Sequence, residues 1–180
     1  MKNFLVSGYP GSGKTTILLE IKQELELQGF RAGGCLTTEI REKGRRIGFN
    51  ISDLESGGEG ILAHIESPSN KRIGRYGVNI SELEKIGVNA LIESLTKPVD
   101  FVIIDEIASM ELFSSRFQKI VRDLLNSPKI ILGSIHYRSK HPFLQEIRGR
   151  PDVKIIKITR ENRNTIHPRL VNKILQVLTP

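Results

Sequence analysis

This chain has little cysteine and no long apolar runs. Cys35 is the only cysteine among 180 residues, which excludes an internal disulfide and favours a reducing, cytoplasmic setting. It lies in an apolar stretch, so we expect a buried thiol rather than a nucleophile. No apolar run approaches the roughly 18 residues that a membrane-spanning helix needs, and the N-terminus lacks a signal-peptide pattern. We therefore expect a soluble, intracellular protein without a membrane partner.

Internal repeats, low-complexity tracts and linkers rich in proline or glycine are also absent. The chain is 38% hydrophobic and 26% charged, which is typical of an ordinary globular protein. Its length fits one domain with a sizeable core. We expect a single domain over residues 1–180 and, because no coiled coil or long exposed apolar helix is evident, a monomer.

Basic residues exceed acidic ones, 27 Lys and Arg against 20 Asp and Glu, for a net charge of +7. Such an excess favours acidic partners, either nucleoside triphosphates or nucleic acids. The basic residues are scattered, however, and no aromatic residues interleave with them as in a nucleic-acid-binding module. The composition therefore favours a nucleotide over a nucleic acid as the primary partner.

The most informative motif lies close to the N-terminus. Glycines allow backbone N–H groups to converge on phosphate oxygens, forming an anion-binding nest. In such a loop the lysine, here Lys14, reaches the β- and γ-phosphates and is expected to be catalytic. The hydroxyl of Thr15 is the expected Mg²⁺ ligand. The predicted nucleotide-binding loop consists of Gly8, Tyr9, Pro10, Gly11, Ser12, Gly13, Lys14, Thr15 and Thr16.

The surroundings of this loop match the setting that its function requires. The apolar run 3–6 is typical of a buried parallel strand and leads directly into Gly8. The N-terminus of the helix that follows attracts phosphate, and Gly29 offers a stop for it. Apolar residues recur at helical spacing after the loop: Ile17, Leu18, Ile21 and Leu25.

Further apolar runs alternate with helical patterns along the chain. One predicted helix opens on Ser81-Glu82-Leu83-Glu84, a capping-box match. Strands are expected over 34–36, 101–104, 130–132 and 153–158. Helices are expected through Leu83, Ile86, Ala90, Leu91 and Leu95, through Phe117, Ile120, Val121, Leu124 and Leu125, and through Leu170, Val171, Ile174, Leu175 and Leu178.

The segment 37–66 breaks this alternation. Its short alternating runs, 46–51 and 60–65, are separated by glycine-containing breaks, which favours antiparallel hairpin strands that extend the sheet edge. Elsewhere the alternation of strands and helices favours a mostly parallel, twisted sheet with helices on both faces. The predicted fold class is therefore α/β, in three layers, with an antiparallel hairpin extension.

A pair of carboxylates follows the apolar run 101–104. An aspartate at the end of such a strand holds Mg²⁺ through water, opposite the loop hydroxyl, and this role is expected for Asp105. Glu106 is expected to face the γ-phosphate and to act on a water molecule, as a general base or as a group that orients the water. The alternative for Asp105 is a cap that ends the strand, and the alternatives for Glu106 are a surface carboxylate or a partner for a nearby arginine. The adjacent pair favours hydrolysis, because a kinase must exclude water from an acceptor site.

Several other polar residues have alternative interpretations. Glu39 and Arg41 follow a strand and form either an ion pair, which is favoured, or contacts to water and phosphate. Ser134 follows a strand, where related folds place a sensor of the γ-phosphate. Asn79 or Ser81 is the expected helix cap.

One tyrosine, two histidines and three arginines are further candidates for roles in the site. Tyr76 is an alternative candidate for stacking on a base. His136 and His141 lie too far from other metal-binding residue types to form a metal site, so surface or capping roles are expected. The segment 148–150 is the only compact candidate for an arginine-rich lid. An arginine on the γ-phosphate raises rates by about 10³–10⁵-fold where present, and its candidates are Arg148, Arg150 and Arg163.

Over nearly its whole length the chain resembles the thermostable nucleoside-triphosphatase family of small P-loop enzymes, which has cancer-related relatives in higher organisms. The most specific parts are the Tyr-Gly-Val-Asn box at 76–79 and the Asp-Glu-Ile and Met-Glu-Leu boxes between 105 and 112. The resemblance includes the phosphate loop and extends to the segments 37–41, 48–49, 74–80, 141–142 and 161–163.

This resemblance implies a RecA-like, three-layer P-loop NTPase fold. It also implies Mg²⁺-dependent hydrolysis of ATP, GTP, CTP, UTP and TTP to the diphosphate and phosphate, with little discrimination among bases. A second nucleotide-binding segment would comprise Val102, Ile103, Ile104, Asp105, Glu106, Ile107, Ala108 and Ser109.

The chain departs from the family pattern at three positions. The family usually carries glycine, and often lysine, where this chain has Ala108 and Ser109, and it carries aspartate where this chain has Asn164. Alanine allows fewer backbone conformations than glycine, and a missing lysine removes a charge near the phosphates. Slower turnover would follow, although the groups expected to carry the chemistry are unchanged. A nucleoside or nucleotide kinase and a nucleic-acid-associated ATPase are the alternative functions.

Overall fold

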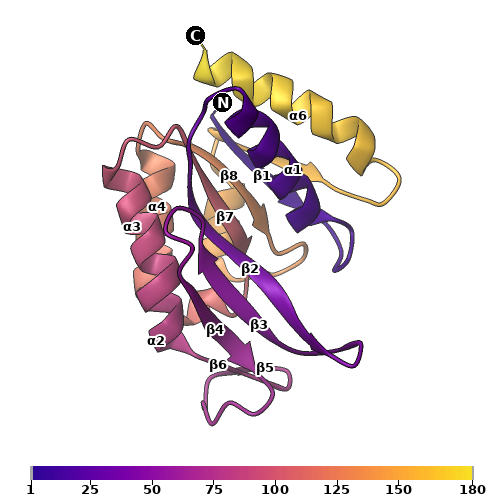
Figure 1. The fold of residues 1–180 in the computed structure, drawn as a ribbon, viewed down its shortest axis with the longest axis vertical. Helices are drawn as coiled ribbons and strands as arrows, with labels where there is room; N and C mark the ends of the chain where they lie inside the picture. Colours follow the sequence, from indigo (N-terminus) through magenta and orange to yellow (C-terminus); the bar gives the residue numbers. More distant parts are fainter. Residues whose placement is uncertain (1, 180) are drawn as a thin grey trace.

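A mixed sheet of nine strands forms the middle layer of the protein in a computed structural model that describes residues 2–179 (Figure 1). The strands are β1 (Asn3–Ser7), β2 (Ala32–Glu42), β3 (Arg45–Asp53), β4 (Glu59–His64), β5 (Arg72–Ile73), β6 (Tyr76–Val78), β7 (Phe101–Ile107), β8 (Ile130–Ile135) and β9 (Val153–Lys157). Their order across the sheet is β5-β6-β4-β3-β2-β7-β8-β1-β9.

Helices cover both faces of this sheet, as Figure 1 shows for α1 and α6 on one side and α3 and α4 on the other. The α-helices are α1 (Lys14–Leu27), α2 (Ile80–Glu82), α3 (Asn89–Thr96), α4 (Ser115–Asn126), α5 (Pro142–Arg148) and α6 (Arg163–Leu178). A π-helical segment, η1 (Leu83–Val88), joins α2 to α3, and a short 3-10 helix, η2 (Glu111–Phe113), precedes α4. The predicted three-layer α/β fold is thereby confirmed.

The apolar run 101–104 forms the start of strand β7, which is covered by helices on both faces. Phe101 and Ile103 pack into the core beneath α1 and α6, whereas Val102 and Ile104 pack into the core beneath α3 and α4. Because successive side chains point to opposite faces, the part of β7 that is covered on both faces is apolar, and the carboxylates Asp105 and Glu106 follow it near the end of the strand.

The parallel part of the sheet brings the motifs to one edge. Strands β2, β7, β8, β1 and β9 are parallel neighbours, and β8 lies between β1 and β7. Their C-terminal ends therefore share an edge, where doubly wound sheets bind ligands. The phosphate loop follows β1 at this edge, Asp105 and Glu106 lie near the end of β7, and Ser134 lies near the end of β8.

The predicted hairpin extension is also confirmed. Strand β3 pairs antiparallel with β2, and β4 pairs antiparallel with β3. The strands β5 and β6 form a further small hairpin that the sequence pattern did not predict. They have two and three residues, too few for an alternating pattern to be recognised.

The helix predicted after residue 80 starts earlier and is less regular than expected. The Asn79 side chain accepts a hydrogen bond from the Glu82 backbone N–H at 3.1 Å, so Asn79 is the cap. Ser81 lies inside the first turn, and the predicted capping box at Ser81 was wrong.

Helix α5 was not predicted. It begins after His141, whose Nδ1 accepts a hydrogen bond from the Phe143 N–H at 3.2 Å, so the capping role expected for this histidine is confirmed.

Two further sequence expectations concern Cys35 and the membrane. The thiol of Cys35 is free and buried in β2, and burial raises its pKa, so it is not a reactive nucleophile. Among residues 2–179, none of the helices combines the length and the apolar character that crossing a membrane requires.

Candidate functional site

The loop between β1 and α1 has the backbone geometry of an anion cradle. Gly11 and Gly13 have φ values of 75° and 95°, in the left-handed region that favours glycine. Gly13 precedes the first residue of α1, so the helix N-terminus opens onto the loop. A Cβ atom on Gly8 would overlap the carbonyl oxygen of Ile158, so the loop lies directly against the chain that leaves β9.

The ammonium group of Lys14 lies inside this cradle. Its Nζ atom donates a hydrogen bond to the Gly8 carbonyl oxygen at 3.2 Å and lies 3.9 Å from Oε1 of Glu106. The Lys14 side chain is 12% exposed. A mostly buried cation at this point provides a strong attraction for phosphate oxygens.

Asp105, near the end of β7, is hydrogen-bonded to one side chain of α1 and one of β8. The Thr15 hydroxyl donates a hydrogen bond of 2.6 Å to Oδ2 of Asp105, and the Ser134 hydroxyl donates another to Oδ1. Burial raises the pKa of the Asp105 carboxyl, while the two hydroxyls and the positive charge of Lys14 lower it. Ser134 is fully buried and hydrogen-bonds to this carboxylate.

The oxygen atoms of Thr15 and Asp105 form a suitable donor set for Mg²⁺. A hydroxyl and a carboxylate are hard oxygen ligands, and Mg²⁺ retains several waters when it binds to one or two such groups. The 2.6 Å separation of the two side-chain oxygens places both groups beside a position for one small ion. The residues present therefore fit this metal.

Glu106 is the second carboxylate of the site, next to Lys14. Burial raises the pKa of its carboxyl, the charge of Lys14 lowers it, and Asp105 raises it. A carboxylate with a raised pKa is a better proton acceptor than an ordinary surface glutamate. No arginine forms an ion pair with Glu106 in the described part of the chain.

A cleft of about 490 Å³ contains these groups. Its walls come from the phosphate loop, from the ends of β7 and β8 and from the hairpin extension. It is lined by Gly8, Tyr9, Pro10, Gly11, Lys14, Thr15, Thr37, Glu39, Arg46, Phe49, Ile73, Asp105, Glu106, Ala108, Ser109, Met110, Glu111, His136, Tyr137 and Arg138.

Not every residue predicted to bind nucleotide lines this cleft. Thr16 is exposed on α1, and Ser12 and Gly13 belong to the loop without lining the cleft. Within the second predicted segment only Asp105, Glu106, Ala108 and Ser109 line it. The structure places the remaining side chains in the core with no exposed surface, because the strand is covered on both faces: Val102, Ile103, Ile104 and Ile107.

The arginines considered for the γ-phosphate are differently placed. Arg148 donates hydrogen bonds to the backbone carbonyls of Ser139 and His136, and Arg150 forms an ion pair with Asp152. These contacts do not support a lid over 148–150.

Another of the candidate arginines lies beside the phosphate loop. A Cβ atom on Gly13 would lie 3.1 Å from a guanidinium nitrogen of Arg163. The arginines that line the cleft are two that the sequence did not single out, Arg46 and Arg138.

The Arg46 side chain is held on the hairpin wall of the cleft. Its guanidinium lies 5.0 Å from the Phe49 ring centroid and 5.6 Å from that of Tyr76, and it donates to Glu39 Oε1 at 2.7 Å. Glu39 also pairs with Arg41, which confirms the expected ion pair. Tyr76 is 8% exposed and its hydroxyl accepts a hydrogen bond from Arg46, so its ring is not available for stacking on a base.

Glu111, Thr37 and Tyr137 are further lining residues that sequence reasoning did not include among the site residues. A signal existed for Glu111, because it lies in the Met-Glu-Leu box. Thr37 begins the Thr-Thr-Glu segment, which also belonged to the resemblance. Tyr137 had no such signal. Its ring packs on that of Tyr9 with centroids 4.8 Å apart.

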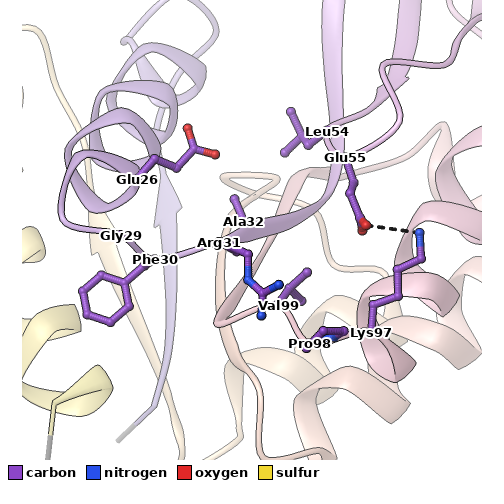
Figure 2. A pocket seen from close by; sticks show the side chains of 10 residues that line it. All are labelled: Glu26, Gly29, Phe30, Arg31, Ala32, Leu54, Glu55, Lys97, Pro98 and Val99. Atoms are coloured by element: carbon purple, nitrogen blue, oxygen red, sulfur yellow. Dashed lines mark hydrogen bonds and ion pairs between the residues drawn. The ribbon is translucent and has the colours of Figure 1, made fainter.

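A second hollow of about 470 Å³ lies at the opposite end of β2, near the start of β7 (Figure 2). Lys97 and Glu55 form an ion pair of 3.1 Å there. None of the residues predicted to bind nucleotide lines this hollow. It is lined by Glu26, Gly29, Phe30, Arg31, Ala32, Leu54, Glu55, Lys97, Pro98 and Val99.

Comparison with known proteins agrees with this geometry. A profile described as NTPase matches residues 3–175. The chain belongs to this NTPase family. The nucleoside-triphosphatase THEP1 of Thermotoga sp. strain RQ2 is 43% identical over 97% of this chain and 94% of that protein. The THEP1 protein of Thermofilum pendens is 40% identical over 98% and 97% of the respective chains.

Solved structures of NTPase family proteins share the fold. The crystal structure of THEP1 from Aquifex aeolicus has a TM-score of 0.82 and 34% identity, covering 99% of both chains. The solution structure of a human cancer-related nucleoside triphosphatase has a TM-score of 0.82 and 36% identity, covering 98% of both. The expected P-loop NTPase fold and the expected enzyme class, a nucleoside-triphosphatase, are confirmed.

Proposed function

We propose that this NTPase family member hydrolyses nucleoside triphosphates to the diphosphate and phosphate with Mg²⁺, accepting ATP, GTP, CTP, UTP and TTP. The observation that carries the proposal is the 2.6 Å contact between Thr15 and Asp105, with Lys14 and Glu106 in the same cleft. It joins a phosphate cradle, a metal-binding pair of oxygens and a candidate base at one end of the sheet.

The phosphate loop binds the triphosphate through its backbone. N–H groups of the loop and of the first turn of α1 point at the phosphate oxygens, and the ammonium of Lys14 neutralises the β- and γ-phosphates. Lys14 must exchange its present contacts with Gly8 and Glu106 for these phosphates. That exchange leaves the Glu106 carboxylate free to accept a proton.

In this proposal Thr15 and, through water, Asp105 would hold Mg²⁺. The bound ion would neutralise charge on the β- and γ-phosphate oxygens. Ser134 keeps the Asp105 carboxylate oriented through its hydrogen bond. Since Asp105 is 2% exposed, a carboxylate in this environment needs such donors to remain ionised.

Glu106 acts as the general base. It takes a proton from the attacking water while the water oxygen bonds to the γ-phosphorus and the bond to the diphosphate breaks. General-base catalysis of this kind contributes about 10²–10⁴-fold in rate. Little discrimination among the nucleobases is expected, because the residues proposed to act contact only the phosphates.

The proposal includes three further points. The principal partner is the nucleoside triphosphate rather than a nucleic acid. The protein acts as a monomer, in the cytoplasm. The free, buried thiol of Cys35 supports a reducing compartment.

Phosphate release from the five triphosphates, with and without Mg²⁺, tests the proposal. The wild type is compared with Lys14→Ala, Glu106→Gln and the control Glu26→Gln, which changes an exposed carboxylate on α1. We expect weaker binding of a non-hydrolysable triphosphate in Lys14→Ala, and near-normal binding with turnover lowered by about 10²-fold or more in Glu106→Gln. Equal phosphate release from all four proteins would reject the proposal.

The cleft also favours one second candidate, a nucleoside or nucleotide kinase. Beyond Glu106 it has an apolar wall formed by Phe49, Ile73 and Met110, which is suited to the ring of a phosphoryl acceptor. A kinase predicts that adding nucleosides or nucleoside monophosphates raises triphosphate turnover many-fold and yields a phosphorylated acceptor. A hydrolase predicts phosphate release that does not depend on the acceptor.

A further inference from the structure

The cleft wall contains two polar atoms that the proposed chemistry has not used. Five side-chain atoms in the described part of the chain are buried without a hydrogen-bond partner, and two of them belong to residues that line the cleft. They are Oε2 of Glu111 and Oγ1 of Thr37. Because buried polar groups nearly always have partners, such atoms in a ligand-binding cleft indicate that a bound molecule supplies the hydrogen bonds.

Glu111 and Thr37 lie on the same side of the sheet. Thr37 shares a face of β2 with Cys35, two residues earlier, and the charge of Glu111 raises the pKa of the Cys35 thiol. Glu111 lies in η2, directly after the segment that leaves β7, and is 3% exposed. The two unpartnered atoms therefore come from neighbouring parts of one wall.

Both residues lie close to Glu106. Leu36 pairs with Asp105 in the parallel register of β2 and β7, so each chain advances by one residue to Thr37 and to Glu106. Glu106 is also among the charges that raise the pKa of the Glu111 carboxyl. The cleft thus has a hydroxyl and a second carboxyl group beside the candidate general base.

A small polar molecule suits these groups better than a second cation. A water molecule in a protein makes two to four hydrogen bonds, and the Thr37 hydroxyl, the Glu111 carboxyl and Glu106 offer that number. Acidic and histidine side chains do not form a cluster with metal-binding geometry anywhere in residues 2–179. Burial raises the pKa of the Glu111 carboxyl to about 8, and in its protonated form this carboxyl can donate a hydrogen bond.

We propose that Thr37 and Glu111 hold the attacking water against Glu106 in the cleft wall, and so position the nucleophile of the hydrolysis. The inference rests on the proposed function. The water oxygen bonds to the γ-phosphorus, the diphosphate leaves with the electrons of the broken P–O bond, and the proton of the water passes to Glu106. Thr37 and Glu111 exchange no proton in the net reaction, and they are positioning residues.

The test separates kcat from KM in four variants, measured with ATP and Mg²⁺ beside the affinity for a non-hydrolysable ATP analogue. Thr37→Val and Glu111→Ala remove the positioning groups, whereas Thr37→Ser and Glu111→Gln retain hydrogen-bonding atoms. We expect Thr37→Val to lower kcat by roughly 10–100-fold, because small misplacements of a reacting group have effects of that size. KM and the affinity for the analogue change less than about twofold, and Thr37→Ser retains most of the kcat.

Glu111→Gln is expected to retain more kcat than Glu111→Ala. Should Glu111→Ala fail to fold, the Thr37 pair decides, since a threonine-to-valine change preserves shape. An unchanged kcat in Thr37→Val overturns the inference, as does an equal loss in Thr37→Ser and Thr37→Val. Either of these two results overturns the inference alone, provided that the wild type hydrolyses ATP and Glu106→Gln does not, because the proposed function is then still supported. A wild type that releases no phosphate removes both.

Discussion

The hydroxyl of Thr15 donates a 2.6 Å hydrogen bond to the carboxylate of Asp105, a residue 90 positions later in the chain. The contact joins the first turn of α1 to the end of β7 across the intervening strand β8. It brings two oxygen ligands together where a triphosphate would carry its metal. In this way the sheet order, rather than sequence proximity, assembles the site.

This pair leads to a prediction about metal dependence. Thr15→Val removes the hydroxyl, so the concentration of Mg²⁺ needed for half-maximal turnover should rise by roughly tenfold or more, because one of few protein ligands is lost. Thr15→Ser keeps the oxygen and should remain close to the wild type. Turnover measured against Mg²⁺ concentration at saturating ATP checks this, and identical Mg²⁺ curves for the Val and Ser variants would contradict it.

Gly8 is predicted to be intolerant of any side chain. A Cβ atom there would overlap the Ile158 carbonyl oxygen, and such overpacking typically costs about 1–3 kcal/mol. Gly8→Ala should therefore lower the free energy of unfolding by that amount, as measured by urea denaturation. The matched control is Gly149→Ala, where the added atom meets the nearest backbone oxygen at an ordinary 3.5 Å. If both variants unfold at the same urea concentration, the predicted overlap between a Cβ atom on Gly8 and the Ile158 carbonyl oxygen is contradicted.

Glu111 is predicted to make stability depend on pH. Burial raises its pKa from 4.5 to about 8, so between these values the folded protein keeps a proton that the unfolded chain releases. Its stabilising contribution is therefore complete below about pH 4.5 and is lost as the pH rises through about 8.

Glu111→Gln removes this titration. Urea unfolding from pH 5 to pH 8.5 should show the wild type losing stability relative to the Gln variant as the pH rises. The exposed control Glu26→Gln should follow the wild type throughout. Parallel curves for the wild type and Glu111→Gln would show that the Glu111 carboxyl titrates as it does in water.

The helix cap at Asn79 provides a prediction about stability alone. Its side chain accepts a hydrogen bond from the Glu82 N–H, and replacing such a cap by alanine costs about 1 kcal/mol. Asn79→Ala should lower the free energy of unfolding by about this amount, whereas Ser81→Ala, inside the first turn, should leave it within about 0.5 kcal/mol. Denaturant unfolding of both variants distinguishes the two candidate caps, and a larger loss at Ser81 would reverse the assignment.

Local patterns were sufficient for the elements that carry the phosphate-binding motifs. The strand, loop and helix around Gly8–Thr15 follow from apolar periodicity and glycine spacing, because the required backbone conformations depend on residues close together in sequence. The apolar run at the start of β7 was recognisable because strands buried on both faces are nearly continuous runs of apolar residues. The short strands β5 and β6 and the helix α5 were not, since none has a long enough periodic signal. The helix through Leu83 and Ile86 was predicted, but the π-helical form of η1 was not.

Two short segments of the sequence contain the groups for binding phosphate and metal: spaced glycines, one lysine, one hydroxyl and two carboxylates. Which other side chains accompany these groups depends on the tertiary structure. It placed Val102, Ile103 and Ile104 in the core and brought Thr37, Arg46 and Glu111 to the cleft. Strand order and register bring residues that are far apart in the sequence to one edge of the sheet, and no local pattern contains that order.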